Sequence, residues 1–213
     1  MDPMLIGYFP RHTLRRPVAP SLRNVEEVCS LGQYGQYGPE NWVDQWQHNT
    51  MWLYDSEEIA LKVMANAIDI HIEPDPGRNP PWQVRLTREP RTEFDYYAYK
   101  LFPLRFTNGK EERLNLPSMK VLPLPSDYRR LGYDAVNGVQ CSDPGNATYW
   151  AEFGCSPLFC NGMANQIPVN RYCLIDEPER AFEVARSFSV GDVEPGPYFV
   201  VEVWRKDQVR PLT

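Results

Sequence analysis

Apolar and polar residues alternate in several parts of the chain. In residues 68–72 isoleucine alternates with polar side chains, and residues 82–86 repeat the pattern. In residues 93–101 aromatic side chains occupy both the odd-numbered and the even-numbered positions. Residues 198–204 are rich in aromatic and β-branched side chains. A period of two predicts strands. We therefore expect four strands, with 93–101 covered on both faces and 198–204 as the closing strand of the sheet.

Shorter apolar runs predict further strands at 4–9, 25–29, 133–136 and 171–175. The stretch 114–125 contains three prolines, which cannot donate to a ladder of hydrogen bonds, so it is not a central strand. Asn108-Gly109 is a turn signal between two extended segments. Antiparallel pairing is expected around that turn.

Two segments begin with the pattern of a capping box, in which a capping side chain is followed three residues later by Glu. They are Asp55 with Glu58 and Asp176 with Glu179, and apolar residues follow each at the spacing of one helix face. A third, short helix is expected at 39–48, because a proline and a glutamate open it and two tryptophans share one side. The sequence thus predicts about three short helices.

These elements predict a single α+β domain over residues 1–213, with a mostly antiparallel, mixed sheet, about three short helices and long ordered loops. Residues 207–213 are expected to be a frayed tail. Residues 138–169 show no period, and we expect them to pack over one end of the sheet and form a pocket or contact surface. The doublet of Gln-Tyr-Gly at 33–38 is too short to indicate a repeat architecture.

Composition narrows the class of protein. Hydrophobic residues make up 42% and aromatic residues 13% of the 213 residues, which predicts a folded core. The net charge of −6 disfavours nucleic acid as a partner. No stretch resembles a secretory signal or a membrane span, and an odd number of cysteines, 5, suits a reducing compartment where thiols stay free. We therefore expect a cytoplasmic protein that does not contact membranes.

The segment from Cys155 to Asn161 is the most unusual in composition, because small polar groups lie between aromatic residues. Cys155 and Cys160 could ligate zinc, but a second closely spaced pair is missing. As nucleophiles they would need a histidine nearby, and Ser156 lacks the second glycine of a nucleophile elbow. Buried, inert packing of the cysteines is the favoured alternative.

His48 stands with an asparagine between two tryptophans at a predicted helix end. That arrangement fits a ligand pocket, and it equally fits a helix C-cap. Glycine-rich phosphate loops of the nucleotide-binding folds do not occur in the sequence.

Three stretches, 132–136, 155–162 and 195–203, resemble a group of uncharacterised bacterial proteins without an assigned activity. The resemblance covers most of the chain and implies a bacterial cytoplasmic origin. Because the group has no established chemistry, it assigns no site.

The order of several residue types is also similar to that of mono-ADP-ribosyltransferases, which use a basic residue on the first strand, a serine or aromatic residue in the middle and a glutamate on a late strand. Arg11 or His12, then Tyr54 and Ser56, then Glu202 occur in that order. The strand motif with two spaced hydroxyl residues is missing, which puts the activity in doubt. The resemblance implies NAD as the substrate and one cleft shared by these residues.

Our first hypothesis is therefore a non-catalytic binding or interaction protein, whose partner is a protein or a small molecule. The second is an enzyme acting on a nucleotide-like substrate, with Glu202 and His48 as catalytic residues. Arg11, Tyr54, Ser56, Cys155, Ser156 and Asn161 would then line its binding site. The third is a structural zinc module. The first hypothesis needs no cofactor, whereas the others imply NAD or zinc, and the sequence does not determine the oligomeric state.

Overall fold

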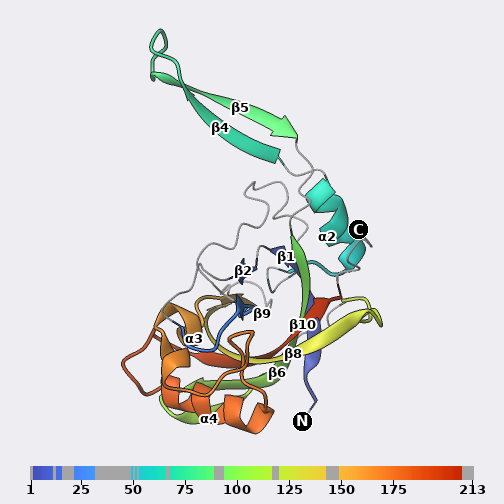
Figure 1. Cartoon of the computed structure of the whole chain (residues 1–213), viewed down its shortest axis with the longest axis vertical. Helices are drawn as coiled ribbons and strands as arrows, with labels where there is room; N and C mark the ends of the chain where they lie inside the picture. The colour runs from blue at the N-terminus through green and yellow to red at the C-terminus, as the bar shows by residue number, and fades with distance from the viewer. Residues whose placement is uncertain are drawn as a thin grey trace.

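The computed structural model describes residues 2–11, 13–15, 22–31, 49, 51, 53–65, 68–88, 94–116, 120–142 and 149–207. Over these residues the protein is an α+β structure in which an antiparallel sheet packs against three helices (Figure 1), as the sequence predicts. The helix expected at 39–48 lies outside the described residues. Within the described part of the chain, the helices are too short or too polar to cross a membrane.

The main sheet has six strands in the order β1, β6, β10, β8 and β9, with β7 paired to β6. All of these pairings are antiparallel. The strands are β1 (Met4–Arg11), β6 (Asp95–Thr107), β7 (Lys110–Arg113), β8 (Tyr128–Ser142), β9 (Tyr149–Phe153) and β10 (Tyr198–Lys206).

The last strand, β10, lies at the centre of this sheet between β6 and β8. The prediction that 198–204 closes the sheet was therefore wrong about its position. The first six residues of β10 are all buried. A strand covered on both faces reads as a continuous apolar run, and that is the signature of a central strand rather than an edge.

A tight turn joins β6 to β7. Asn108 and Gly109 both have positive φ, 51° and 76°. Two central residues with positive φ define the type I′ turn, whose twist matches that of the two strands it connects. The predicted turn is confirmed.

The three helices are α2 (Glu57–Ala65), α3 (Pro157–Cys160) and α4 (Pro178–Phe188), and Met163–Asn165 forms one 3₁₀ turn. The starts of α2 and α4 differ from the prediction by one residue, whereas α3 was not predicted. Ser56 Oγ accepts the Ile59 backbone N–H at 3.2 Å and so caps α2, while Glu177 occupies the cap position of α4. The predicted caps, Asp55 and Asp176, have another role.

The loop before α4 is organised by Asn170. Its Nδ2 donates to the carbonyl oxygen of Leu131 at 2.9 Å and to Asp176 Oδ1 at 2.8 Å. Its Oδ1 accepts the backbone N–H groups of Tyr172 at 2.9 Å and Leu174 at 3.3 Å. This turn replaces the strand predicted at 171–175, because the asparagine takes up the backbone groups that a ladder would have paired.

The loop before α2 is built in the same way around Asn49. Its Nδ2 donates to the carbonyl oxygen of Ile6 at 2.9 Å and to Asp55 Oδ1 at 3.0 Å. Its Oδ1 accepts the backbone N–H groups of Met51 at 2.8 Å and Leu53 at 3.3 Å. The two asparagines thus make the same four hydrogen bonds at corresponding places in the chain.

This correspondence extends to the sheet. Gly7 of β1 stands opposite Tyr99 of β6, and Gly132 of β8 stands opposite Val203 of β10. Tyr99 and Val203 also stand opposite each other in the central pair, β6 and β10. A twofold axis through that pair therefore exchanges β1 with β8, β6 with β10 and α2 with α4. The fold is an internal duplication of a strand, asparagine loop, helix and strand.

The two faces of the sheet differ in what covers them. We call the first the helix face, because α4 packs on it. The buried residues of α4 form a core there with sheet residues such as Val200, and they are Ala181, Val184, Ala185 and Phe188. The opposite face is contacted by residues 30–31 and 153–156, and we call it the loop face. Leu22, Val25 and Val28, earlier in the same loop, belong to the core that contains α4.

Two smaller ribbons complete the described structure. β2 (Leu14–Arg15) pairs with β3 (Glu27–Val28), and β4 (Ile68–Pro74) pairs with β5 (Trp82–Arg88). The β4–β5 hairpin extends away from the main sheet (Figure 1). Its strands correspond to the alternating segments of the sequence.

Candidate functional site

Glu202, predicted as a catalytic carboxylate, is buried on the helix face of β10. It accepts a hydrogen bond from Trp204 Nε1 at 2.7 Å. Lys100 Nζ and Arg130 Nη1 each lie 3.6 Å from one of its oxygens. Lys100 Nζ also lies 4.4 Å from the centroid of the Trp204 ring. The Glu202 carboxylate is thus neutralised within the protein, as in a structural charge cluster.

Arg11, predicted as a binding residue, lies on the loop face. It stands opposite Asp95, and Tyr97, two residues further along β6, stands opposite Arg205. Residues that stand opposite each other point to the same face of a sheet, and so do residues two apart on one strand. Arg11, Asp95, Tyr97 and Arg205 therefore share one face. Glu202 is three residues from Arg205 on β10, so it points to the other face. The sheet lies between Arg11 and Glu202. The common cleft that the transferase resemblance implies is not formed by these two residues.

Tyr54 and Ser56 hold the start of α2 in place. The backbone groups of Tyr54 and Tyr8 exchange two hydrogen bonds of 2.9 Å, and the Tyr54 ring stacks on Phe9 with centroids 6.2 Å apart. Ser56 is the cap of α2. Both residues therefore support the first asparagine loop and its helix. His48 lies outside the described residues.

The segment from Cys155 to Asn161 is a short helical turn closed by a disulfide between Cys155 and Cys160, whose Cα atoms are 6.5 Å apart. This separation is within the range that a disulfide spans. The finding corrects the expectation of free thiols or zinc ligands at these two positions. Asn161 is exposed at the end of α3. The described residues contain no group of three or more His, Cys, Asp or Glu side chains placed to hold a metal ion.

Ser156 leads to a buried carboxylate that the sequence analysis missed. Its hydroxyl donates to Asp134 Oδ1 at 2.6 Å, and the backbone N–H of Leu31 donates to Oδ2 at 2.9 Å. Burial raises the pKa of Asp134 to about 6, although both hydrogen bonds and the charge of Arg11 oppose the shift. The available signal was a single aspartate inside the apolar strand predicted at 133–136.

The raised pKa of Asp134 predicts that the free energy of unfolding depends on pH, and that Asp134→Asn removes this dependence. Because the pKa in the folded protein is about 6 and the ordinary value is 3.8, the folded state binds this proton more tightly than the unfolded state. The contribution is therefore largest below pH 4 and is lost as the pH rises through 6. We expect the free energy of unfolding of the wild type, relative to Asp134→Asn, to fall by about 2 kcal/mol between pH 4 and pH 7.

Urea unfolding of both proteins across that pH range measures the difference directly. The variant provides the baseline, because every other titrating group is common to both proteins. Parallel curves for the two proteins would show that Asp134 does not titrate with a raised pKa.

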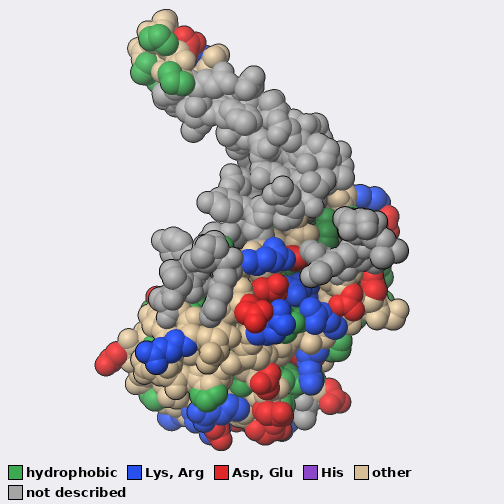
Figure 2. Space-filling view, in the orientation of Figure 1, with side chains coloured by type: hydrophobic (Ala, Val, Ile, Leu, Met, Phe, Trp, Pro, Cys, Tyr) green, Lys and Arg blue, Asp and Glu red, His purple; other side chains and the backbone are tan. Residues whose placement is uncertain are grey.

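Further charged residues of the loop face, near Arg11, form ion pairs. Arg15 Nη2 lies 2.6 Å from Asp95 Oδ2, and Arg15 Nε lies 3.5 Å from Glu27 Oε1. Arg205 Nη1 lies 2.5 Å from Glu27 Oε2. Figure 2 shows Lys and Arg side chains intermixed with Asp and Glu across the middle of the molecule. The surface charge there is balanced rather than of one sign.

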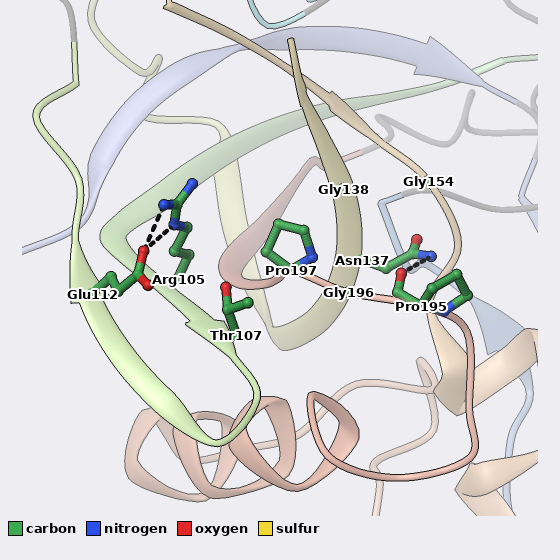
Figure 3. Close-up of a pocket in the computed structure, with 9 residues that line it drawn as sticks. All are labelled: Arg105, Thr107, Glu112, Asn137, Gly138, Gly154, Pro195, Gly196 and Pro197. Atoms are coloured by element: carbon green, nitrogen blue, oxygen red, sulfur yellow. Dashed lines mark hydrogen bonds and ion pairs between the residues drawn. The ribbon is translucent and has the colours of Figure 1, made fainter. Parts of the chain in front are cut away.

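A recess of about 460 Å³ lies at the opposite end of the sheet from Arg11. Figure 3 shows Arg105 paired with Glu112 on one wall and Asn137 bonded to the Pro195 carbonyl oxygen on the other. Arg105 Nε lies 2.6 Å from Glu112 Oε2, so these two charges neutralise each other. The remaining lining residues are Thr107, Gly138, Gly154, Gly196 and Pro197. Segment 138–169, where the sequence shows no period, contains the end of β8 and all of β9 and contributes two glycines to this recess.

No family model, curated protein or solved structure matches this chain. The two resemblances drawn from the sequence therefore receive no support from these comparisons.

Proposed function

We propose that this protein is an interaction protein that binds a protein partner through the β4–β5 hairpin. The observation that carries the proposal is the hairpin's isolation. Its two strands pair with each other and with no other strand among the described residues, and it extends away from the main sheet (Figure 1).

A free two-stranded ribbon is marginally stable in water and has two open edges. Its register sets Ile70 opposite Leu86 and Ile72 opposite Val84, while His71 stands opposite Arg85. In the middle of the ribbon the apolar positions of both strands therefore share one face and the polar positions share the other, while Arg88, opposite Ile68, falls on the apolar face at the end of the ribbon. A ribbon with one apolar face is suited to packing against a second protein, with strand addition at an open edge as a further contribution.

The internal duplication shows that the fold does not require the hairpin. In the second half, residues 189–197 connect α4 directly to β10. In the first half, residues 66–94 make the corresponding connection from α2 to β6 and include the whole hairpin. The hairpin is an addition to a unit that is complete without it, which favours a role in binding over a role in folding.

Replacing residues 68–88 by a short Gly-Ser linker tests this role. We expect the variant to unfold within about 1 kcal/mol of the wild type, because loop length alone has a small effect on stability. We expect it to lose the protein that the wild type captures from its source cell. The captured protein is then purified, and its dissociation constant for both forms is measured by calorimetry.

A matched pair of substitutions localises the contact. Ile70→Lys places a charge on the apolar face, and His71→Lys places one on the polar face of the same strand. We expect the first to weaken binding of the purified partner at least about tenfold, since burying an unpaired charge is costly, and the second to leave it unchanged. Equal affinity of both variants, or undiminished binding without the hairpin, contradicts the proposal.

A further inference from the structure

Arg11 is the largest side chain that is fully buried in the described structure. One of its nitrogens, Nη1, donates to the carbonyl oxygen of Ser30, and its guanidinium lies 4.2 Å from the centroid of the Tyr97 ring. The guanidinium group stays charged in proteins. A buried positive charge of this kind is costly unless an anion or several acceptors surround it.

Four polar atoms around this charge have no hydrogen-bond partner within the described part of the chain. They are Nε and Nη2 of Arg11, the hydroxyl oxygen of Ser30 and the hydroxyl oxygen of Tyr99. The Tyr99 ring stacks on that of Tyr97 with centroids 6.2 Å apart, and Ser30 is the residue whose carbonyl Arg11 contacts. Each of the four can donate a hydrogen bond. The two hydroxyl oxygens can also accept a hydrogen bond, but none of the four atoms makes one with a described residue, so the site holds several unused donors beside a buried positive charge.

The neighbouring carboxylates are engaged elsewhere. Asp95 pairs with Arg15, and Glu27 pairs with Arg205. Asp134 accepts hydrogen bonds at both oxygens from Ser156 and Leu31. Among the described residues, no carboxylate lies within ion-pair distance of Arg11.

The other half of the duplication shows what the fold requires at this place. Arg11 lies four residues after Gly7, and Val136 lies four residues after Gly132, so the two occupy corresponding positions. The residue opposite Arg11 is Asp95, and the residue opposite Val136 is Phe199. Val136 and Phe199 are both fully buried and apolar. The fold therefore accepts an aliphatic and an aromatic side chain at these two positions and does not require the charge of Arg11.

We propose that Arg11, with Ser30 and Tyr99, binds an oxyanion, a carboxylate or phosphate group, on the loop face of the sheet. The free nitrogens Nε and Nη2 lie on the same edge of the guanidinium and present two parallel N–H bonds, which is the geometry that engages two oxygens of one oxyanion. The hydroxyl groups of Ser30 and Tyr99 supply further donors. This site is separate from the hairpin and does not depend on the partner proposed above.

The test compares the wild type with Arg11→Met, and with Arg180→Met as a matched control on the surface of α4. Thermal unfolding is followed in sodium acetate, sodium phosphate and sodium chloride at constant ionic strength and pH. We expect acetate or phosphate to raise the Tm of the wild type relative to chloride, by on the order of 5 °C once the anion is in large excess over its dissociation constant. Arg180→Met should behave as the wild type, and Arg11→Met should show no such rise.

The acetate and phosphate arms show which oxyanion the site prefers, and calorimetric titration of the same salt gives its dissociation constant. If Arg11→Met does not fold, Tyr99→Phe and Ser30→Ala take its place, with several-fold weaker binding expected for each. An identical response of the wild type and the Arg11 variant overturns the proposal. Equal Tm values of the wild type in all three salts also overturn it.

Discussion

Gly132→Ala is expected to lower the free energy of unfolding by more than about 3 kcal/mol, because both the backbone conformation and the space require glycine. The φ of Gly132 is +149°, which side chains rarely allow. An added Cβ would lie 2.8 Å from the Ile175 carbonyl oxygen and 2.9 Å from Leu174 Cβ. These atoms belong to the asparagine loop, which cannot move without breaking the bridge between Tyr133 and Ile175. Chemical denaturation measures the loss.

The duplication provides a second glycine at which the same substitution can be made, and a glycine in the hairpin turn provides a control. Gly7 also has a φ of +149°, and a Cβ there would lie 2.5 Å from Leu53 Cβ, so Gly7→Ala should cost at least as much. Among the described residues, only Asp75 would lie close to a Cβ at Gly77 in the hairpin turn, with its Oδ1 at 3.7 Å, and Gly77→Ala should change stability by less than about 1 kcal/mol. Similar values for Gly132→Ala and Gly77→Ala would show that the close contact at β8 is wrong.

Asn170→Ala is expected to cost about 4 kcal/mol of stability. The substitution leaves the Leu131 carbonyl oxygen and the N–H groups of Tyr172 and Leu174 without this partner. Each unsatisfied buried group costs about 1–3 kcal/mol, and partial access of water to the loop keeps the total near the lower end of the sum. Asp176 loses a hydrogen bond as well. Denaturant unfolding gives the value.

The exposed Asn115 in the segment after β7 is the control, and Asn115→Ala should change stability by less than about 0.5 kcal/mol. Asn49→Ala should cost nearly the same as Asn170→Ala, because the two side chains make the same four hydrogen bonds. A loss below about 1 kcal/mol for Asn170→Ala would mean that the loop keeps its shape without the side chain.

Local sequence patterns were sufficient to predict most elements of the fold. The alternating residues of β4 and β5, the long apolar strand β6 and the Asn108-Gly109 turn all carry their signal within a few residues. The position of β10 in the sheet could not be predicted in this way, because strand order depends on pairing between distant segments.

The duplication was missed because its signal is short and widely spaced. Both halves contain Gly-Tyr on the first strand, and both contain an asparagine followed by leucine four residues later and aspartate six residues later. In the first half these are Asn49, Leu53 and Asp55, and in the second they are Asn170, Leu174 and Asp176. The pattern was visible, but neither aspartate was assigned its role, since both also fit helix caps.

The residues of the site were predicted less well than the elements. Arg11 and Ser156 were named, and the structure places both on the loop face near Asp134. Ser30 and Tyr99 were not named, because a serine in a loop and a tyrosine in an aromatic strand have no distinctive local pattern. Only the sheet register and burial bring them to Arg11.

The twofold axis has a consequence for how the two halves differ. A symmetric homodimer of one half would repeat every substitution on both sides of its axis, so a buried arginine at the position of Arg11 would appear twice. Covalent linkage of the halves removes that constraint. Val136 and Phe199 can then preserve one half of the hydrophobic interior, while the other half is free to evolve a charged interior around Arg11.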